Sequence, residues 1–183
     1  MVFLALGGIG LSLAIRELPP RLVGFGRHAS HWKNHQGEFL NWGEGTHSSM
    51  AVSRLPSGVL HYHNAGKIQA SSESRGLLLQ RMLGHLATLL PMQASQSVLV
   101  IGCGAGITAG SASIDSRVEQ VRIGEIEPLV PQVVAGCFAG PNFHVVRNPK
   151  VAVTIWGPLP FGDLSGCFPE GLIFGNSAGP AFR

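Results

Sequence analysis

A glycine-rich run followed by a distant carboxylate is the part of this sequence whose residue types are best suited to chemistry. Residues 102–106 read GCGAG, and Glu125 stands about 20 residues further along. Because glycine has no Cβ, a ligand can approach the main chain closely at Gly102, Gly104 and Gly106. A carboxylate in the place of Glu125 can accept hydrogen bonds from both hydroxyl groups of a ribose. The combination predicts a nucleoside-binding site.

The spacing of the glycines favours one class of nucleoside ligand. The pattern G-x-G-x-G differs from the dinucleotide fingerprint G-x-G-x-x-G, because Ile107 stands where the third glycine would be. We therefore favour S-adenosyl ligands over NAD. A tight strand-to-helix bend that binds no ligand would also call for glycines here, and this alternative stays open.

Alternating strands and helices are expected to position this loop. The predicted elements are a strand at Gln96–Ile101, a helix reaching Ile114, a strand at Val118–Glu125, a helix opening at Pro128, a strand at Val151–Ile155 and a further short strand at Gly171–Phe174. Such alternation implies a parallel sheet with right-handed crossovers.

A different periodicity precedes the glycine loop. Ser49–Arg54 and Val59–His63 alternate on either side of a turn-rich connection, which predicts a β-hairpin. From Gly76 to Pro91 the apolar residues recur at helical spacing, which predicts an amphipathic helix of about 14 residues.

The predicted fold class is α/β: a small N-terminal β-hairpin domain followed by an incomplete Rossmann-like parallel sheet of the S-adenosylmethionine methyltransferase type. The predicted division is an apolar stub or linker over 1–26, a β-rich domain plus helix over 27–92 and a partial nucleoside-binding domain over 93–183.

Composition argues against several classes of protein. The 25 glycines and 12 prolines among 183 residues exclude a coiled coil or a long helical bundle. The formal charge of +3 comes without a Lys/Arg block, so nucleic acid is not an expected partner. Cys103, Cys137 and Cys167 form no CxxC pair, which argues against a zinc finger or a disulfide framework and favours a cytoplasmic location.

Two further patterns bear on a metal site and on a membrane segment. His28, His31 and His35 are spaced i, i+3, i+7, and His61 shares a strand face with His63, but no Cys/Asp pattern accompanies them, so we predict no metal. The apolar segment Met1–Ile15, which ends before Pro19 and Pro20, is shorter than the roughly 20 residues of a membrane span. Membrane association as the tail of a longer membrane region stays open, as does a homodimer.

Four ordered motifs give the chain a family resemblance. They are GKIQAS (66–71), QRMLGHLATLL (80–90), VLVIGCGAGITAG (98–110) and GEIEPLV (124–130). Together they resemble the spermidine/spermine synthases, which are polyamine aminopropyltransferases. The likeness is greatest to bacterial spermidine-synthase-like proteins whose soluble domain often follows a membrane region, and it covers roughly residues 43–149.

The resemblance implies a reaction and a set of binding residues. The reaction would be aminopropyl transfer from decarboxylated S-adenosylmethionine to a polyamine amine, without a metal. The implied nucleoside-binding residues are Gly102, Gly104, Ala105, Gly106 and Glu125, with Gln69 at the mouth of the donor and amine site. Gln80 and His85 are weaker candidates, for which packing of a helix face is the favoured interpretation.

Several positions depart from the family's pattern. Ala105 stands where the family usually has Asp, and Trp156 follows the third strand where an acidic residue is expected. The catalytic Asp falls on Asn176, which cannot act as a general base, so the catalytic residue is left unassigned. A divergent, inactive family member and a truncated or frame-disturbed fragment are both compatible, and we slightly favour the second. A methyltransferase that uses S-adenosylmethionine and a binding domain without turnover remain alternative functions.

Overall fold

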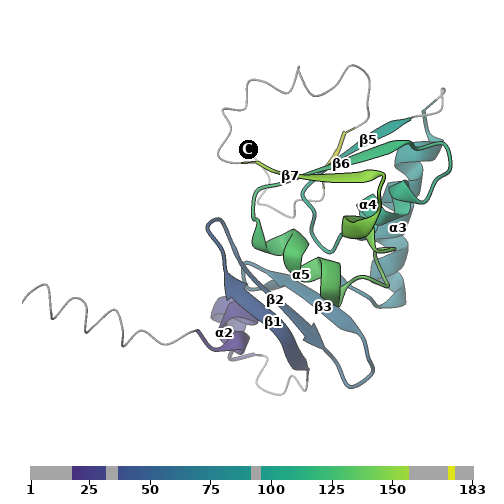
Figure 1. Ribbon diagram of the computed structural model, residues 1–183. Helices are drawn as coiled ribbons and strands as arrows, with labels where there is room; N and C mark the ends of the chain where they lie inside the picture. Colours follow the sequence, from purple (N-terminus) through teal and green to yellow (C-terminus); the bar gives the residue numbers. More distant parts are fainter. Residues whose placement is uncertain (1–17, 32–36, 92–95, 157–172, 176–183) are drawn as a thin grey trace, which may run out of the picture.

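The structure, a computed structural model, describes residues 18–31, 37–91, 96–156 and 173–175 (Figure 1). The apolar segment Met1–Ile15, Cys167 and Asn176 lie outside the described residues. No helix within the described ranges is long and apolar enough to cross a membrane. The described chain forms two four-stranded sheets connected by helices.

The first sheet is antiparallel and contains the predicted hairpin. Its strands are β1 (Glu38–Glu44), β2 (Ser49–Arg54), β3 (Leu60–Asn64) and β4 (Lys67–Ser71), in the order β1-β2-β3-β4. The hairpin of β2 and β3 is confirmed, with Val52 opposite Tyr62. The two outer strands were not predicted. In β1 the register shifts between Phe39 and Asn41, so the apolar alternation that would announce a strand is interrupted.

The second sheet is parallel, as the β-α alternation predicts. Its strands are β5 (Ser97–Ile101), β6 (Gln120–Glu125), β7 (Val151–Ile155) and β8 (Ile173–Gly175), in the order β7-β6-β5-β8. The order reverses between β5 and β8, since β6 and β7 lie on one side of β5 and β8 on the other. In open α/β sheets ligands bind at such a switch point, outside the carboxyl ends of the strands.

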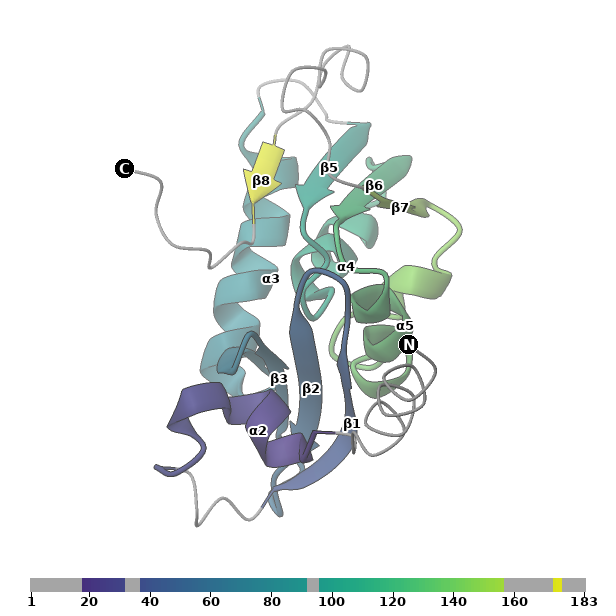
Figure 2. The same cartoon turned by 90° about the vertical axis from the view of Figure 1, so that its left-hand side faces the viewer.

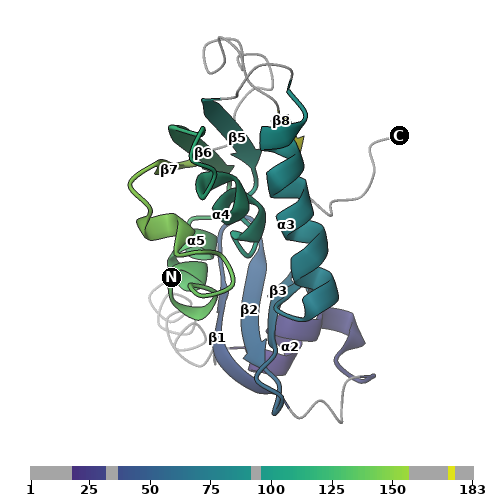
Figure 3. The same ribbon diagram turned by 90° about the vertical axis from the view of Figure 1, so that its right-hand side faces the viewer.

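Three helices pack beside the parallel sheet, and Figure 3 shows two of them, α3 and α4, in front of β5 and β6. They are α3 (Ser74–Leu89), α4 (Ile107–Ser113) and α5 (Leu129–Cys137), with a 3-10 turn η2 (Val145–Arg147) after α5. Gly84 of α3 packs directly on the main-chain carbonyl of Thr108 in α4. Because a side chain at Gly84 would force these helices apart, their spacing depends on this glycine.

A short helix covers the antiparallel sheet on the face away from α5 (Figure 2). It is α2 (Pro20–Phe25), followed by the 3-10 turn η1 (Gly26–His28), and it falls in the range expected to be a stub or linker. Pro20 takes the first helical position, where its missing N–H costs nothing. Nδ1 of the buried His63 lies 3.0 Å from the Gly24 carbonyl, and Nε2 lies 2.8 Å from Ser53 Oγ. These contacts fix α2 on β2 and β3.

One buried cluster connects the two sheets. Met50, Val52 and Tyr62 of the antiparallel sheet belong to the same apolar core as Val98 and Val100 of β5. The helix α5 lies between the sheets, and it contacts both β1 and β2. The parallel sheet and the hairpin are therefore held by a common core, which fixes the hairpin near the carboxyl ends of the parallel strands.

Candidate functional site

The glycine loop begins where β5 ends, beside the switch point of the parallel sheet. Gly102, Gly104 and Gly106 have φ angles of 83°, 51° and 77°, in the left-handed region that glycine adopts readily. The N–H of Gly102 donates to the Gly124 carbonyl on β6 at 2.7 Å, and the N–H of Gly106 closes a turn on the Cys103 carbonyl at 2.8 Å. The loop is therefore a defined turn fixed to the neighbouring strand.

The structure brings the predicted carboxylate onto this loop. Oε2 of Glu125 accepts the N–H of Cys103 at 2.7 Å, while Oε1 accepts the N–H groups of Ile126 at 2.8 Å and Glu127 at 2.9 Å. The side chain is only 7% exposed. A carboxylate offers about four acceptor positions, so roughly one remains for a ligand hydroxyl while these three bonds are intact.

The side chain of Cys103 belongs to the apolar core. It is 3% exposed. Burial, and secondarily the negative charge of Glu125, raises the pKa of this thiol to about 12. Because the thiolate is the reactive form, Cys103 is unsuited to nucleophilic catalysis at neutral pH.

A second carboxylate on the same segment has a role that the sequence did not reveal. Oε2 of Glu127 accepts the N–H groups of His47 at 2.8 Å and Ser48 at 3.4 Å, and Oε1 accepts the N–H of Leu129 at 3.2 Å. A Cβ on Gly45 would collide with the carboxylate. Glu127 therefore ties the turn between β1 and β2, residues 45–48, to the end of β6.

The charge of Glu127 is stabilised without a cationic side chain among its described hydrogen-bond partners. Burial pushes the pKa of this carboxyl upward, but the main-chain N–H groups of His47, Leu129 and Ser48 outweigh burial, and the pKa is lowered overall. Only the spacing Glu-Ile-Glu at the end of a predicted strand could have drawn attention to this residue. Its hydrogen-bond partners on the turn lie 79 and 80 residues away in the sequence.

An aromatic ring occupies the place where the family resemblance implies an acidic residue. The N–H of Trp156 donates to the Glu125 carbonyl at 2.7 Å, which continues the pairing of β7 with β6. A Cβ on Gly124 would meet three atoms of the indole ring at nearly equal distances, so the ring lies flat over this glycine. The residue of β6 that precedes Glu125 is thus covered by an aromatic ring.

Three other predicted site residues, Ala105, Gln69 and Gln80, differ from one another in burial and in hydrogen bonding. Ala105 has no exposed surface, and its side chain belongs to the apolar core. Gln69 projects from β4 with an exposed side chain, and no hydrogen bond between it and the loop is found among the described residues. Gln80 is buried on α3. Its Nε2 donates weakly to Gly76 O at 3.4 Å, and its Oε1 has no hydrogen-bond partner in the described part of the chain.

His85 is half-buried on α3, and its main-chain carbonyl accepts a hydrogen bond from Thr88 Oγ1. Within the described ranges, no three His, Cys, Asp or Glu side chains gather in a way that could hold a metal ion.

Comparison with known proteins identifies the fold. No family model and no curated protein matches the chain. Among solved structures it is similar to a spermidine synthase in complex with the transition state analogue AdoDATO and to spermidine synthase from Thermotoga maritima, each with a TM-score of 0.58 and 18% identity. The chain shares the fold of the spermidine synthases.

The similarity extends over only part of each chain. Each match covers 65% of this chain and 41% of the synthase, so the chain spans less than half of the proteins it resembles. The shared architecture agrees with the α/β class predicted from the sequence. Membership of the bacterial membrane-fused branch stays a prediction.

Proposed function

We propose that the loop after β5 and the carboxylate of Glu125 bind the nucleoside part of an S-adenosyl ligand. The observation that carries this proposal is the direct hydrogen bond, 2.7 Å long, between the Cys103 N–H in the loop and the Glu125 carboxylate at the end of the next strand. Support comes from the position of this carboxylate, beside a turn in which Gly102 and Gly104 are half-buried and at the switch point of a parallel sheet.

In this proposal five of the described residues contact the ligand. Gly102 and Gly104 present main chain without a Cβ to the ligand. Glu125 accepts a ribose hydroxyl with its remaining lone pair. Trp156 and Ile126, which is 48% exposed, offer apolar surface on either side of Glu125 for a nucleobase.

The reaction we propose is aminopropyl transfer, with decarboxylated S-adenosylmethionine as donor and a polyamine as acceptor. The acceptor nitrogen attacks the methylene carbon bonded to the sulfonium, the carbon–sulfur bond breaks with its electron pair going to sulfur, and methylthioadenosine leaves. The attacking amine must lose a proton to a base, which no described residue is assigned to be. Support comes from the fold shared with spermidine synthases, one of them solved with AdoDATO.

Calorimetric titration of the full chain tests the binding proposal. We expect saturable binding of methylthioadenosine and decarboxylated S-adenosylmethionine, weakened about tenfold to a hundredfold by Glu125→Gln, because a hydrogen bond from the ligand to a charged group is lost. Glu119→Gln removes the same charge from an exposed position just before β6, and it should leave the affinity unchanged. Absence of binding to a folded sample, or equal effects of the two variants, would reject the proposal.

Binding without turnover is the second candidate function. Both carboxylates at this edge, Glu125 and Glu127, already accept three main-chain N–H groups each, which suits them to holding rather than to proton abstraction. Aminopropyl transfer from the decarboxylated donor to putrescine above the uncatalysed background would exclude it. Tighter binding of S-adenosylmethionine than of its decarboxylated form would instead indicate a methyltransferase.

A further inference from the structure

The glycine loop is held from behind by the segment that follows α5, residues 139–145. Asn142 in this segment is 1% exposed. Its Nδ2 donates to the carbonyl of Ala105 in the loop at 3.2 Å and to the carbonyl of Val134 in α5 at 3.3 Å, and its Oδ1 accepts the N–H of Val145 at 3.4 Å. One side-chain amide thus connects the loop, a helix and its own segment.

Two glycines of the sequence signature make room for this segment. A Cβ on Gly106 would lie 2.8 Å from Cγ1 of Val145 and 3.0 Å from Nδ2 of Asn142. A Cβ on Gly110 would collide with the main-chain carbonyl of Asn142. Gly106 and Gly110 are therefore required by contacts inside the protein, whereas the sequence pattern alone suggested that Gly106 makes room for a ligand.

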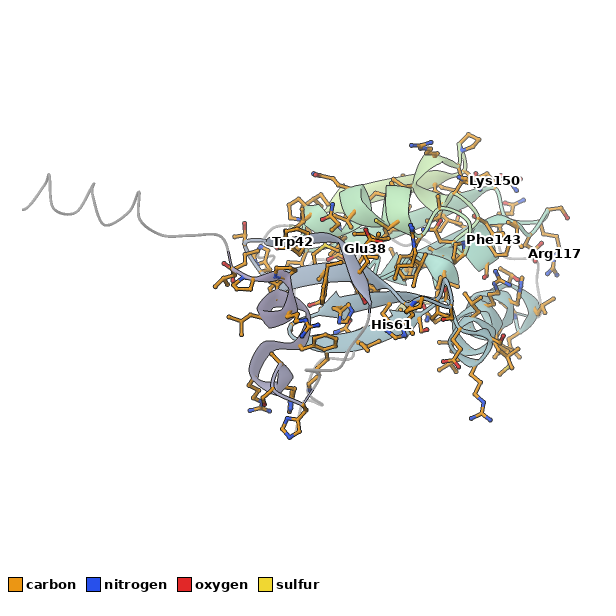
Figure 4. All side chains as sticks on the ribbon, turned by 90° about the horizontal axis from the view of Figure 1, so that it is seen from below. Glu38, Trp42, His61, Arg117, Phe143 and Lys150 are labelled. Atoms are coloured by element: carbon orange, nitrogen blue, oxygen red, sulfur yellow. The ribbon has the colours of Figure 1, made fainter. Side chains whose placement is uncertain are left out.

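The segment adopts a conformation that the chain would not take by itself. Phe143 and His144 have φ angles of 57° and 55°, two successive residues with side chains in the left-handed region. The guanidinium of Arg81 on α3 lies 4.8 Å from the centre of the Phe143 ring, and it donates to the Pro141 carbonyl at 3.5 Å. Phe143 is labelled in Figure 4. Such conformations persist where the surrounding contacts over-determine them, often near functional sites.

We propose that Asn142 is a positioning residue that sets the conformation of residues 102–106 and, through it, the affinity of the loop for its nucleoside ligand. The effect on affinity rests on the proposed function, whereas the effect on the loop does not. The Ala105 carbonyl is fixed from behind by Asn142, and the Cys103 N–H is fixed from the front by Glu125. Without the amide donor, the buried Ala105 carbonyl loses this hydrogen bond. We expect the loop to change its conformation until this carbonyl accepts a hydrogen bond from another donor.

The thiol of Cys103 reports on the loop without any ligand. In a background with Cys137→Ser and Cys167→Ser, a thiol reagent can reach Cys103 only when the loop opens. Asn142→Asp keeps the shape of the side chain but replaces its NH2 donor with a carboxylate oxygen. This oxygen cannot donate to the carbonyls of Ala105 and Val134. We expect about tenfold faster modification of Cys103, the factor that corresponds to one lost buried hydrogen bond. We also expect about tenfold weaker binding of methylthioadenosine.

Asn148→Ala is the matched control. This residue follows the same segment, but its Nδ2 donates to Ser113 Oγ at 3.1 Å, at the far end of α4, and its Oδ1 accepts the Lys150 N–H at 3.0 Å. It should lower the melting temperature while leaving the modification rate and the affinity unchanged. Equal acceleration by both variants, or an unchanged rate in folded Asn142→Asp, would overturn the proposal. Faster modification together with a wild-type chain that binds no nucleoside would reject the proposed function and leave the positioning role standing.

Hydrogen exchange of the wild-type chain provides a second test that needs no folded variant. If Asn142 sets the loop, the amides of Cys103 and Gly106 should exchange through the same opening as those of His144 and Val145, with the same dependence on denaturant. Independent openings of the two segments would overturn the proposal.

Discussion

The glycine loop of residues 102–106 and the turn of residues 45–48 between β1 and β2 are both held by a carboxylate, but they belong to different parts of the fold. Each is a glycine-containing turn bonded through its main chain to a buried carboxylate. Glu125 accepts the N–H of Cys103 in the loop, and Glu127 accepts the N–H groups of His47 and Ser48 in the turn. The loop belongs to the parallel sheet that carries Glu125, whereas the turn belongs to the antiparallel sheet. Glu125 and Glu127 are separated by one residue, yet Glu125 fixes a loop of its own sheet, whereas Glu127 connects two sheets.

This difference teaches that chemical type and place in the sequence do not by themselves separate a binding residue from a structural one. Glu127 holds the two sheets together, so its removal should affect folding first. Glu125 closes the loop proposed to bind a ligand, so its removal should affect affinity first. Substitutions at and around the two acids should separate these two effects.

Gly45→Ala should break the turn between β1 and β2, because the new Cβ would displace the Glu127 carboxylate. The carboxylate can move only by losing its hydrogen bonds from the main chain of His47, Ser48 and Leu129. We expect a loss of about 3 kcal/mol in the free energy of unfolding, measured by urea denaturation. Gly58→Ala is the comparison. Gly58 has a φ of 84° but nothing within 4 Å of its Cβ position, so only backbone strain of about 1 kcal/mol is expected. A Gly45→Ala protein as stable as Gly58→Ala would contradict the contact between turn and carboxylate.

Glu127→Gln should weaken the same connection without a collision. An amide nitrogen would face main-chain donors, and we expect a loss of about 2 kcal/mol in the free energy of unfolding. The modification rate of Cys103 should stay near the wild-type value if the loop and the turn are held separately. A large acceleration in this variant would show that the two regions open together.

Acid should remove part of the stability that Glu127 contributes. Its pKa is lowered in the folded chain, because hydrogen bonds from His47, Leu129 and Ser48 outweigh the opposing effect of burial. The folded state therefore binds this proton less readily than the unfolded state, and stability falls as the pH drops from the ordinary value of Glu, about 4.3, towards the lowered one. Melting temperatures should fall less steeply over this range in Glu127→Gln, and parallel curves for the two proteins would be evidence against this mechanism.

Gly124→Ala should have the smallest effect on stability. The new methyl group would displace the indole ring of Trp156, a movable side-chain end rather than main chain. We expect a loss of less than about 1 kcal/mol and a change in tryptophan emission, compared against Trp156→Phe to isolate this ring. An unchanged spectrum would show that the ring does not lie on Gly124.

Local patterns predicted the elements but not the contacts between them. The strands β2, β3, β5, β6 and β7 follow from period-two alternation and β-branched runs, and α3 from helical spacing. The helix α2 was missed because Pro19 and Pro20 were interpreted as the end of a segment, although proline also suits the first turn of a helix. The role of Glu127 and the packing reason for Gly110 depend on partners far away in the sequence, which periodicity does not reveal.

The carboxylate contacts of Glu125 and Glu127 have a consequence for how this sequence can vary. Both acids are satisfied by main-chain N–H groups, which every residue except proline provides. The side chains of His47, Ser48 and Cys103 can therefore change over evolutionary time without loss of these hydrogen bonds. Distant relatives should retain the acidic pair and the glycines of the turns while the residues between them diverge.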